Sequence, residues 1–183
     1  MDNDERIRTV LADVCQSDVG IHTGLPKPPV SEDLIEASRM LCEQNKCGCY
    51  GTSWTCPPNC GTPSECAGQT LRFSRCALIH RRFAVSPDDR SRMRTVSHSF
   101  QEICRNAKSG LERNGIDCLV MAGGPCTYCS ECAYLDGKPC RFPDRRIPSV
   151  SVYGIDVNGL LTSNGIEVEQ PEGTVTLFGV ILY

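Results

Sequence analysis

The most regular apolar pattern in the chain lies between residues 93 and 111. Spacings of three and four residues there place apolar side chains on one face of an α-helix. Ser86-Pro87-Asp88-Asp89 provides a capping residue, a proline and two acids for its start, and Asn114-Gly115 provides an end. The sequence therefore predicts one long amphipathic helix of roughly six or seven turns. Its apolar positions are Met93, Val96, Phe100, Ile103, Ala107 and Leu111.

Shorter patterns predict the elements around this helix. Ser31 is a good N-cap for a short amphipathic helix, and Thr62-Pro63 is typical of another helix start. A further helix is expected within 148–161. Runs of apolar residues predict strands, and the order of the elements predicts an α+β fold, a layered arrangement of a small mixed sheet with packed helices and two cysteine-rich loops. The expected strands are 76–85, 116–122 and 174–183.

The first 30 residues are weakly patterned. Arg6 to Val14 could form a short helix, and the following Gly24-Leu25-Pro26-Lys27-Pro28-Pro29-Val30 is a proline-rich connector. We therefore expect an N-terminal extension at 1–30 and a single cysteine-rich metal-binding domain at 31–183.

Cysteine is the most unusual feature of the composition, with 14 in 183 residues. An even number is compatible with disulfides, but the first 20 residues are polar and lack the apolar stretch of a signal peptide. No run approaches the roughly 18 apolar residues that a transmembrane helix needs. We therefore expect a cytoplasmic protein, in which clustered cysteines are more often metal ligands than disulfides.

The second cysteine-rich loop carries the more specific motif. Its four cysteines are spaced C-x2-C-x2-C-x7-C. The x2 gaps allow one tight loop to present three thiolates to one cubane, and the first three positions match the bacterial ferredoxin pattern. The spacing predicts a [4Fe–4S] cluster. The predicted ligands are Cys126, Cys129, Cys132 and Cys140.

Zinc is the alternative metal for this loop, and disulfides are a further one. A structural zinc site normally takes two C-x2-C knuckles from separate segments, so three thiols on one loop match that geometry less well. The longer fourth gap also distinguishes the motif from a ferredoxin repeat.

The first cysteine-rich loop, 42–66, is denser but less regular. It contains six cysteines, none at C-x2-C spacing, and a structureless segment of this length is uncommon unless something organises it. Buried thiols that pack as small apolar groups are the alternative interpretation. The predicted ligands of a second metal site are Cys42, Cys47, Cys56 and Cys66, with Cys49 and Cys60 as spare thiols.

Several stretches of the chain resemble a known family. They are CGCYGTSWTCPP, GGPCTYCSECAYLDGKPCRFP, VYGIDV and TVTLFGVILY, within about 31–183. They are similar to the predicted metal-binding proteins of domain-of-unknown-function family 2284, found mainly in anaerobes. The resemblance implies metal binding in an anaerobic redox context. On the family pattern Cys47, Gly51, Cys56 and Pro57 match well, and Cys42 matches approximately.

Charge is unevenly distributed along the chain. The formal net charge is −3, which argues against a strongly basic nucleic-acid binder. Residues 72–113 nevertheless contain ten basic and four acidic residues, a local charge of +6. This segment could form a basic face that docks a redox partner protein, although a solvated helix face would have the same composition.

Together these patterns predict an iron–sulfur protein that acts in electron transfer or a redox reaction, with one cluster and a possible second. One alternative is an iron–sulfur enzyme whose open iron site acts on sulfur compounds or other small molecules. Another is a zinc-stabilised adaptor. No nucleotide-binding or zinc-protease motif is present, so no catalytic residue is assigned.

Overall fold

The fold is built on one four-stranded antiparallel sheet. The computed structural model describes residues 2–183 and orders the strands β1-β2-β4-β3. The expected α+β class is confirmed. All pairings between named strands are antiparallel, and the one parallel pairing is an isolated bridge between Ala122 and Ser149. The strands are β1 (Gly20–Pro26), β2 (Arg75–Phe83), β3 (Leu119–Ala122) and β4 (Val175–Leu182).

Two helices cover one face of the sheet. They are α1 (Asn3–Val14) and the long α4 (Arg90–Arg113), which pack against each other and against alternate strand residues such as Ile79 and Ile181. Strand side chains alternate between the two faces of the sheet, so every second side chain of β2 and β4 packs against these two helices. The apolar face predicted for α4 is confirmed, with Phe100, Ala107 and Leu111 almost completely buried.

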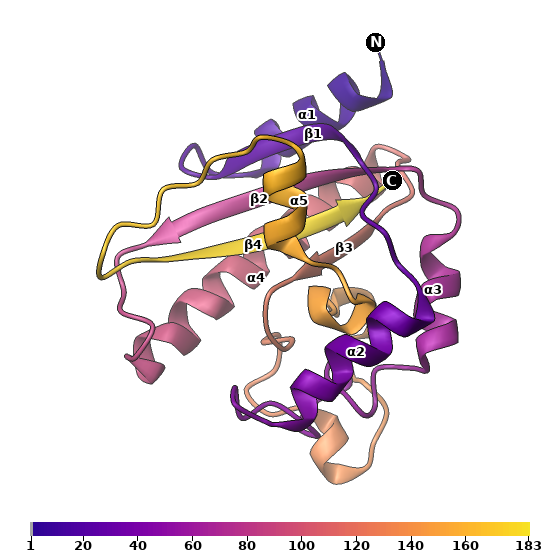
Figure 1. Ribbon diagram of the computed structural model, residues 1–183, viewed down its shortest axis with the longest axis vertical. Coiled ribbons are helices and arrows are strands. Elements are labelled where there is room, and N and C mark those ends of the chain that lie inside the picture. The colour runs from indigo at the N-terminus through magenta and orange to yellow at the C-terminus, as the bar shows by residue number, and fades with distance from the viewer. Residues whose placement is uncertain (1) are drawn as a thin grey trace.

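The opposite face carries shorter helices (Figure 1). Cys76, Leu78 and Leu182 point into this second core. Gly154 ends the 3-10 turn with φ +65° and lies so close to α2 that a Cβ there would stand 2.6 Å from the Leu34 carbonyl carbon. The elements are α2 (Glu32–Glu43), α3 (Pro63–Thr70), the 3-10 turn Val150–Tyr153 and α5 (Val157–Ser163).

Two of the predicted helix starts are present, whereas the long helix α4 begins later than predicted: Asp89, not Ser86, caps it by accepting a hydrogen bond from the Arg92 amide. Ser31 caps α2 by accepting a hydrogen bond from the Leu34 amide, and Thr62 forms a reciprocal capping box with Glu65. The sequence did not predict β1, whose residues lie in the weakly patterned first 30. In the fold, β1 pairs with β2, and Leu11 of α1 is completely buried. This part of the chain is therefore packed into the first core.

Both cysteine-rich loops lie at the same end of the fold (Figure 1). The first connects α2 to α3, and the second begins where β3 ends, at Ala122. The second loop leads to the 3-10 turn Val150–Tyr153, which packs against α2 and so returns the chain to the start of the first loop. This packing is what brings two distant segments together. Within residues 2–183, no helix has the length and apolar character to cross a membrane.

Candidate metal centres

All four cysteines of the second motif line one small cavity. Its volume is about 30 Å³, and Arg146 and Phe142 lie at its border. Part of its wall comes from the first loop, as residues 53–55. The four thiols that line it supply the ligand number of either a structural zinc ion or a four-iron cluster. The cysteines are Cys126, Cys129, Cys132 and Cys140, each half-buried.

Four cysteines of the first loop line a second, larger cavity of about 220 Å³. Its wall includes Gly124 and Pro125, which belong to the second loop. Three of these cysteines belong to the predicted set, and Cys49 is the addition. No sequence spacing separated Cys49 from its neighbours, so only the folded loop could identify it. The cysteines are Cys42, Cys47, Cys49 and Cys56.

The fourth predicted ligand of that set, Cys66, does not line this cavity. It lies on α3 and is only 1% exposed. Its thiol donates to the Cys60 carbonyl oxygen at 3.4 Å, and Arg39 Nη2 donates to its Sγ at 3.3 Å. Cys66 is therefore held in a separate contact with Cys60 and an arginine.

One hydrogen bond joins the two loops where their cavities are neighbours: Thr55 and Cys126 line the second cavity, and Cys56 and Pro125, next to them in the chain, line the first. The Cys126 amide donates to Thr55 Oγ1 at 2.8 Å, and Thr55 Oγ1 also lies 3.1 Å from Ser53 Oγ. Thr55 is 1% exposed and Ser53 is 3% exposed. A buried polar pair of this kind holds its partners at a defined distance because neither group can turn to water instead. The two cavities are thus fixed side by side.

A polar stripe on α4 holds the second loop. His98 Nδ1 lies 3.0 Å from the Thr127 carbonyl oxygen, and Gln101 Nε2 donates to the Pro125 carbonyl oxygen at 2.9 Å. These polar residues recur at helical spacing beside the apolar face of α4. The pattern is present in the sequence, but we did not identify it from the sequence alone. Its members are His98, Gln101, Arg105 and Lys108.

Two members of this stripe are buried despite their polarity. Gln101 is completely buried and Arg105 is 3% exposed. Arg105 Nη1 donates to Gln101 Oε1 at 3.3 Å, and the Arg105 guanidinium lies 5.2 Å from the Tyr128 ring centroid. Burial of such groups is costly unless they are paired, so their partners in the loop are structurally important.

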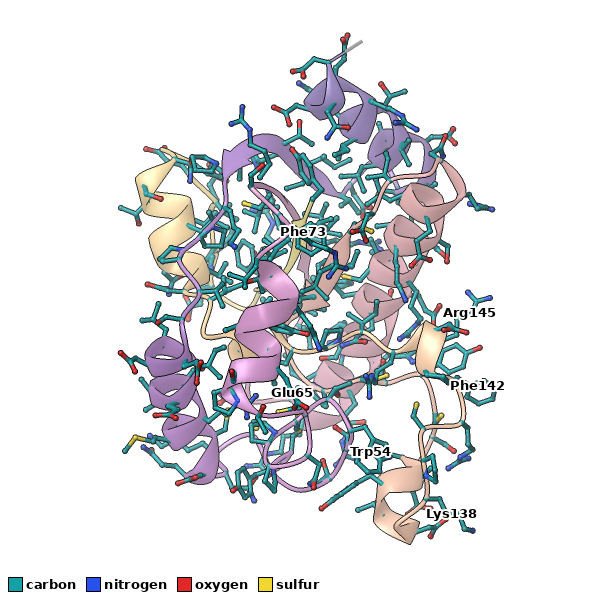
Figure 2. The ribbon with its side chains drawn as sticks, turned by 90° about the vertical axis from the view of Figure 1, so that its right-hand side faces the viewer. Trp54, Glu65, Phe73, Lys138, Phe142 and Arg145 are labelled. Carbon is teal, nitrogen blue, oxygen red and sulfur yellow. The ribbon has the colours of Figure 1, made fainter. Side chains whose placement is uncertain are left out.

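Aromatic side chains cover the outer side of the second loop. Trp54 Nε1 donates to the Lys138 carbonyl oxygen at 3.0 Å, and its ring meets Tyr134 edge to face at 5.2 Å (Figure 2). Tyr128 and Phe142 form a similar pair at 5.0 Å. Trp54, Tyr128 and Phe142 also line the cysteine cavity, although the Tyr128 and Phe142 rings are themselves still exposed to solvent.

The thiols of the first cavity are mutually unfavourable as anions. Burial, together with the nearby Cys47 and Cys56 thiols, raises the pKa of Cys49 to about 12. Burial also raises the pKa of Cys56 to about 11. Among residues 2–183, no three His, Cys, Asp or Glu side chains already converge on one point as ion ligands. The donor set nevertheless suits a thiophilic metal, because a bound cation offsets the repulsion between adjacent thiolates.

The remaining cysteines lie in the cores. Cys76 and Cys104 are completely buried, while Cys15 and Cys118 are half-buried beside the first core. Burial raises the pKa of Cys76 and of Cys118 to about 12. These four thiols pack as small apolar groups.

Much of the basic segment 72–113 is paired with acids. Arginines on β2 and just before it contact carboxylates from other parts of the chain, so the local charge of +6 is partly neutralised in the fold. Arg90 and Arg94, at the start of α4, make no ion pair among the described residues. The ion pairs that these arginines form with acids outside the segment are Arg72–Asp117, Arg75–Asp4, Arg81–Asp18 and Arg82–Glu169.

Comparison with known proteins identifies the family. The sequence model of the family described as "Predicted metal-binding protein", domain of unknown function 2284, matches residues 33–183. The chain therefore belongs to this family, and the match includes both cysteine-rich loops. No curated protein and no solved structure matches the chain.

Proposed function

We propose that this family member is a cytoplasmic iron–sulfur protein that carries electrons between a partner and a redox reaction. One observation carries the proposal: two cavities, each lined by four cysteines, are neighbours at the hydrogen bond between Thr55 and Cys126, because these two residues line one cavity and the next residues along the chain, Cys56 and Pro125, line the other. A bound [4Fe–4S] cluster supplies reversible one-electron chemistry when all its irons have protein thiolates.

The residues of the second cavity support the choice of metal. The three closely spaced cysteines from 126 to 132 and the later Cys140 give the donor number that a cluster requires. In the first cavity we assign Cys42, Cys47, Cys49 and Cys56 as the ligands of a second cluster.

The surroundings suit electron transfer. Trp54, Tyr128 and Phe142 give the second cavity an aromatic lining, and Arg146, which also lines it, favours the more negative, reduced form. At the other cavity, the charge of Arg94 opposes the rise in the pKa of Cys49. We propose that Arg92 and Arg94, near the start of α4, dock an acidic redox partner.

The donor set of the second cavity also supports a second candidate, a zinc-stabilised adaptor. Four thiolates can form a complete tetrahedral zinc site. Zinc there would be structural, with no redox role.

Anaerobic purification followed by iron, acid-labile sulfide and zinc analysis separates the two candidates. The iron–sulfur proposal expects equal amounts of iron and sulfide, and an EPR signal after reduction with dithionite. Stoichiometric zinc without labile sulfide would reject it in favour of the adaptor. Substituting Cys129 with serine should lower the content of whichever metal is found.

A further inference from the structure

A polar cavity of about 200 Å³ lies directly beside the second cysteine cavity. Trp54, Thr55 and Arg146 line both cavities. The space is smaller than the roughly 300–1,000 Å³ of sites for drug-sized ligands, so any occupant is small.

The lining of this cavity is cationic. Lys108 and Arg146 both contribute, and no aspartate or glutamate lines it, although the chain has 22 acidic residues. Arg146 makes no ion pair within the part of the chain that the structure describes. Lys108 Nζ donates to the Asp144 carbonyl oxygen at 2.7 Å and lies 3.6 Å from Glu112 Oε1, so one of its three donors is still free.

Neutral donors complete the lining. The Tyr153 hydroxyl donates to Gln69 Oε1 at 2.7 Å. This bond occupies the amide oxygen and leaves the Gln69 amide nitrogen, which can only donate, as the free end of the side chain. Two cations and an amide donor in a small space form a suitable arrangement for an oxyanion.

We propose that this cavity binds a small oxyanion, either a carboxylate or an inorganic oxyanion, through Arg146, Lys108 and the Gln69 amide. The proposal of a binding site depends only on the residues that line the cavity. The use of this cavity as a substrate site rests on the proposed function, because the shared wall would place the anion next to the second metal centre.

The Cys60 thiol reports on this site because it also lines the cavity and is half-buried. We would measure the alkylation of Cys60 by iodoacetamide with peptide mass mapping, in the metal-loaded protein, at increasing inorganic phosphate or acetate. Bound anion should protect Cys60 in a saturable manner, while the half-buried Cys15, which lines neither this cavity nor a proposed metal site, serves as the internal reference. Calorimetry with phosphate and with acetate would give the affinity for each anion. The anion that binds more tightly shows whether the site takes an inorganic oxyanion or a carboxylate.

Arg146→Gln should raise the anion concentration needed for protection by about tenfold or more, because a charged donor is lost. Lys108→Gln should do the same to a smaller extent. The matched control is Arg90→Gln, which removes an equal charge from the exposed first residue of α4, outside the cavity lining, and should leave binding unchanged.

The inference is overturned if neither phosphate nor acetate binds the wild-type protein at millimolar concentration, or if Arg146→Gln and Arg90→Gln behave alike. Iron and sulfide content, measured on the same samples, tests the proposed function separately. Zinc in place of iron would reject the electron-transfer proposal and would leave the anion site standing.

Discussion

Thr55 Oγ1 accepts a hydrogen bond from the Cys126 amide at 2.8 Å, and this contact joins two loops that lie 71 residues apart in the chain. Thr55→Val keeps the shape of the side chain and removes the acceptor, so the buried amide loses its partner. We expect a loss of about 1–3 kcal/mol in the free energy of unfolding and a lower metal content in both cavities. Chemical denaturation and metal analysis would measure these effects.

Thr127→Val is the matched control for that change. Among the described residues, the buried Thr127 Oγ1 has no hydrogen-bond partner, so its removal should be neutral or slightly stabilising. Equal losses in the two variants would contradict the proposed role of Thr55.

The ligand set of the first cavity can be tested by comparing two cysteines. Cys49→Ser should lower the metal bound at this cavity, because Cys49 lines it together with Cys42, Cys47 and Cys56. Cys66→Ser should retain the metal, because Cys66 contacts Arg39 and Cys60 instead. Metal and sulfide stoichiometry measures both variants. Loss of metal in Cys66→Ser alone would restore the ligand set that the sequence predicted.

Gln101 is expected to be important for the order of the second loop. Gln101→Leu leaves the Pro125 carbonyl oxygen without its donor and removes one contact of the buried Arg105, which keeps its ion pair with Glu102. We expect a loss of about 1–3 kcal/mol in stability and faster proteolysis within 124–142. Gln170→Leu, at an exposed position, is the control and should change neither quantity. Unchanged proteolysis in Gln101→Leu would show that the loop does not depend on α4.

The stability of the fold should depend on pH through His22 and His80. Their Nε2 atoms lie 3.3 Å apart, and their rings are stacked at 5.4 Å. Burial and the charge of Arg8 lower the pKa of His22 below 6.5, and burial and His22 lower that of His80. The unfolded chain therefore binds more protons than the folded protein as pH falls through 6.5, so the free energy of unfolding should decrease there.

Urea denaturation at roughly half-unit pH steps between pH 7.5 and 5 would measure the slope of the free energy of unfolding against pH. The double variant His22→Gln/His80→Gln should have a shallower slope, whatever its absolute stability. A double variant with an unaltered slope would exclude this pair as its source.

Removal of metal should loosen both loops. Metal binding contributes to folding because the ligands are brought together only in the folded chain. We expect chelation to increase proteolysis within 42–66 and 123–145, while α4 and the sheet stay protected. Limited proteolysis with mass mapping measures this, and equal resistance of the loops with and without metal would contradict it.

The sequence predicted much of the framework because its signals were local. The apolar spacing of α4, the caps at Ser31 and Thr62, and the strands of the second half were all recognisable. β1 was missed because a strand of seven residues containing Gly20, Gly24 and Pro26 has little strand character by itself. It is stabilised by pairing with β2, which is a contact between distant segments.

The sequence by itself determined the α+β class, the long helix and the two thiol-rich segments, since helical periodicity and cysteine density are properties of neighbouring residues. Only the tertiary structure decided which thiols share a cavity. It brought Cys49 beside Cys42, Cys47 and Cys56, and separated Cys66 from them. Loops without periodicity take their arrangement from the elements that anchor them, and here those anchors are the β3 end, α2 and the polar stripe of α4.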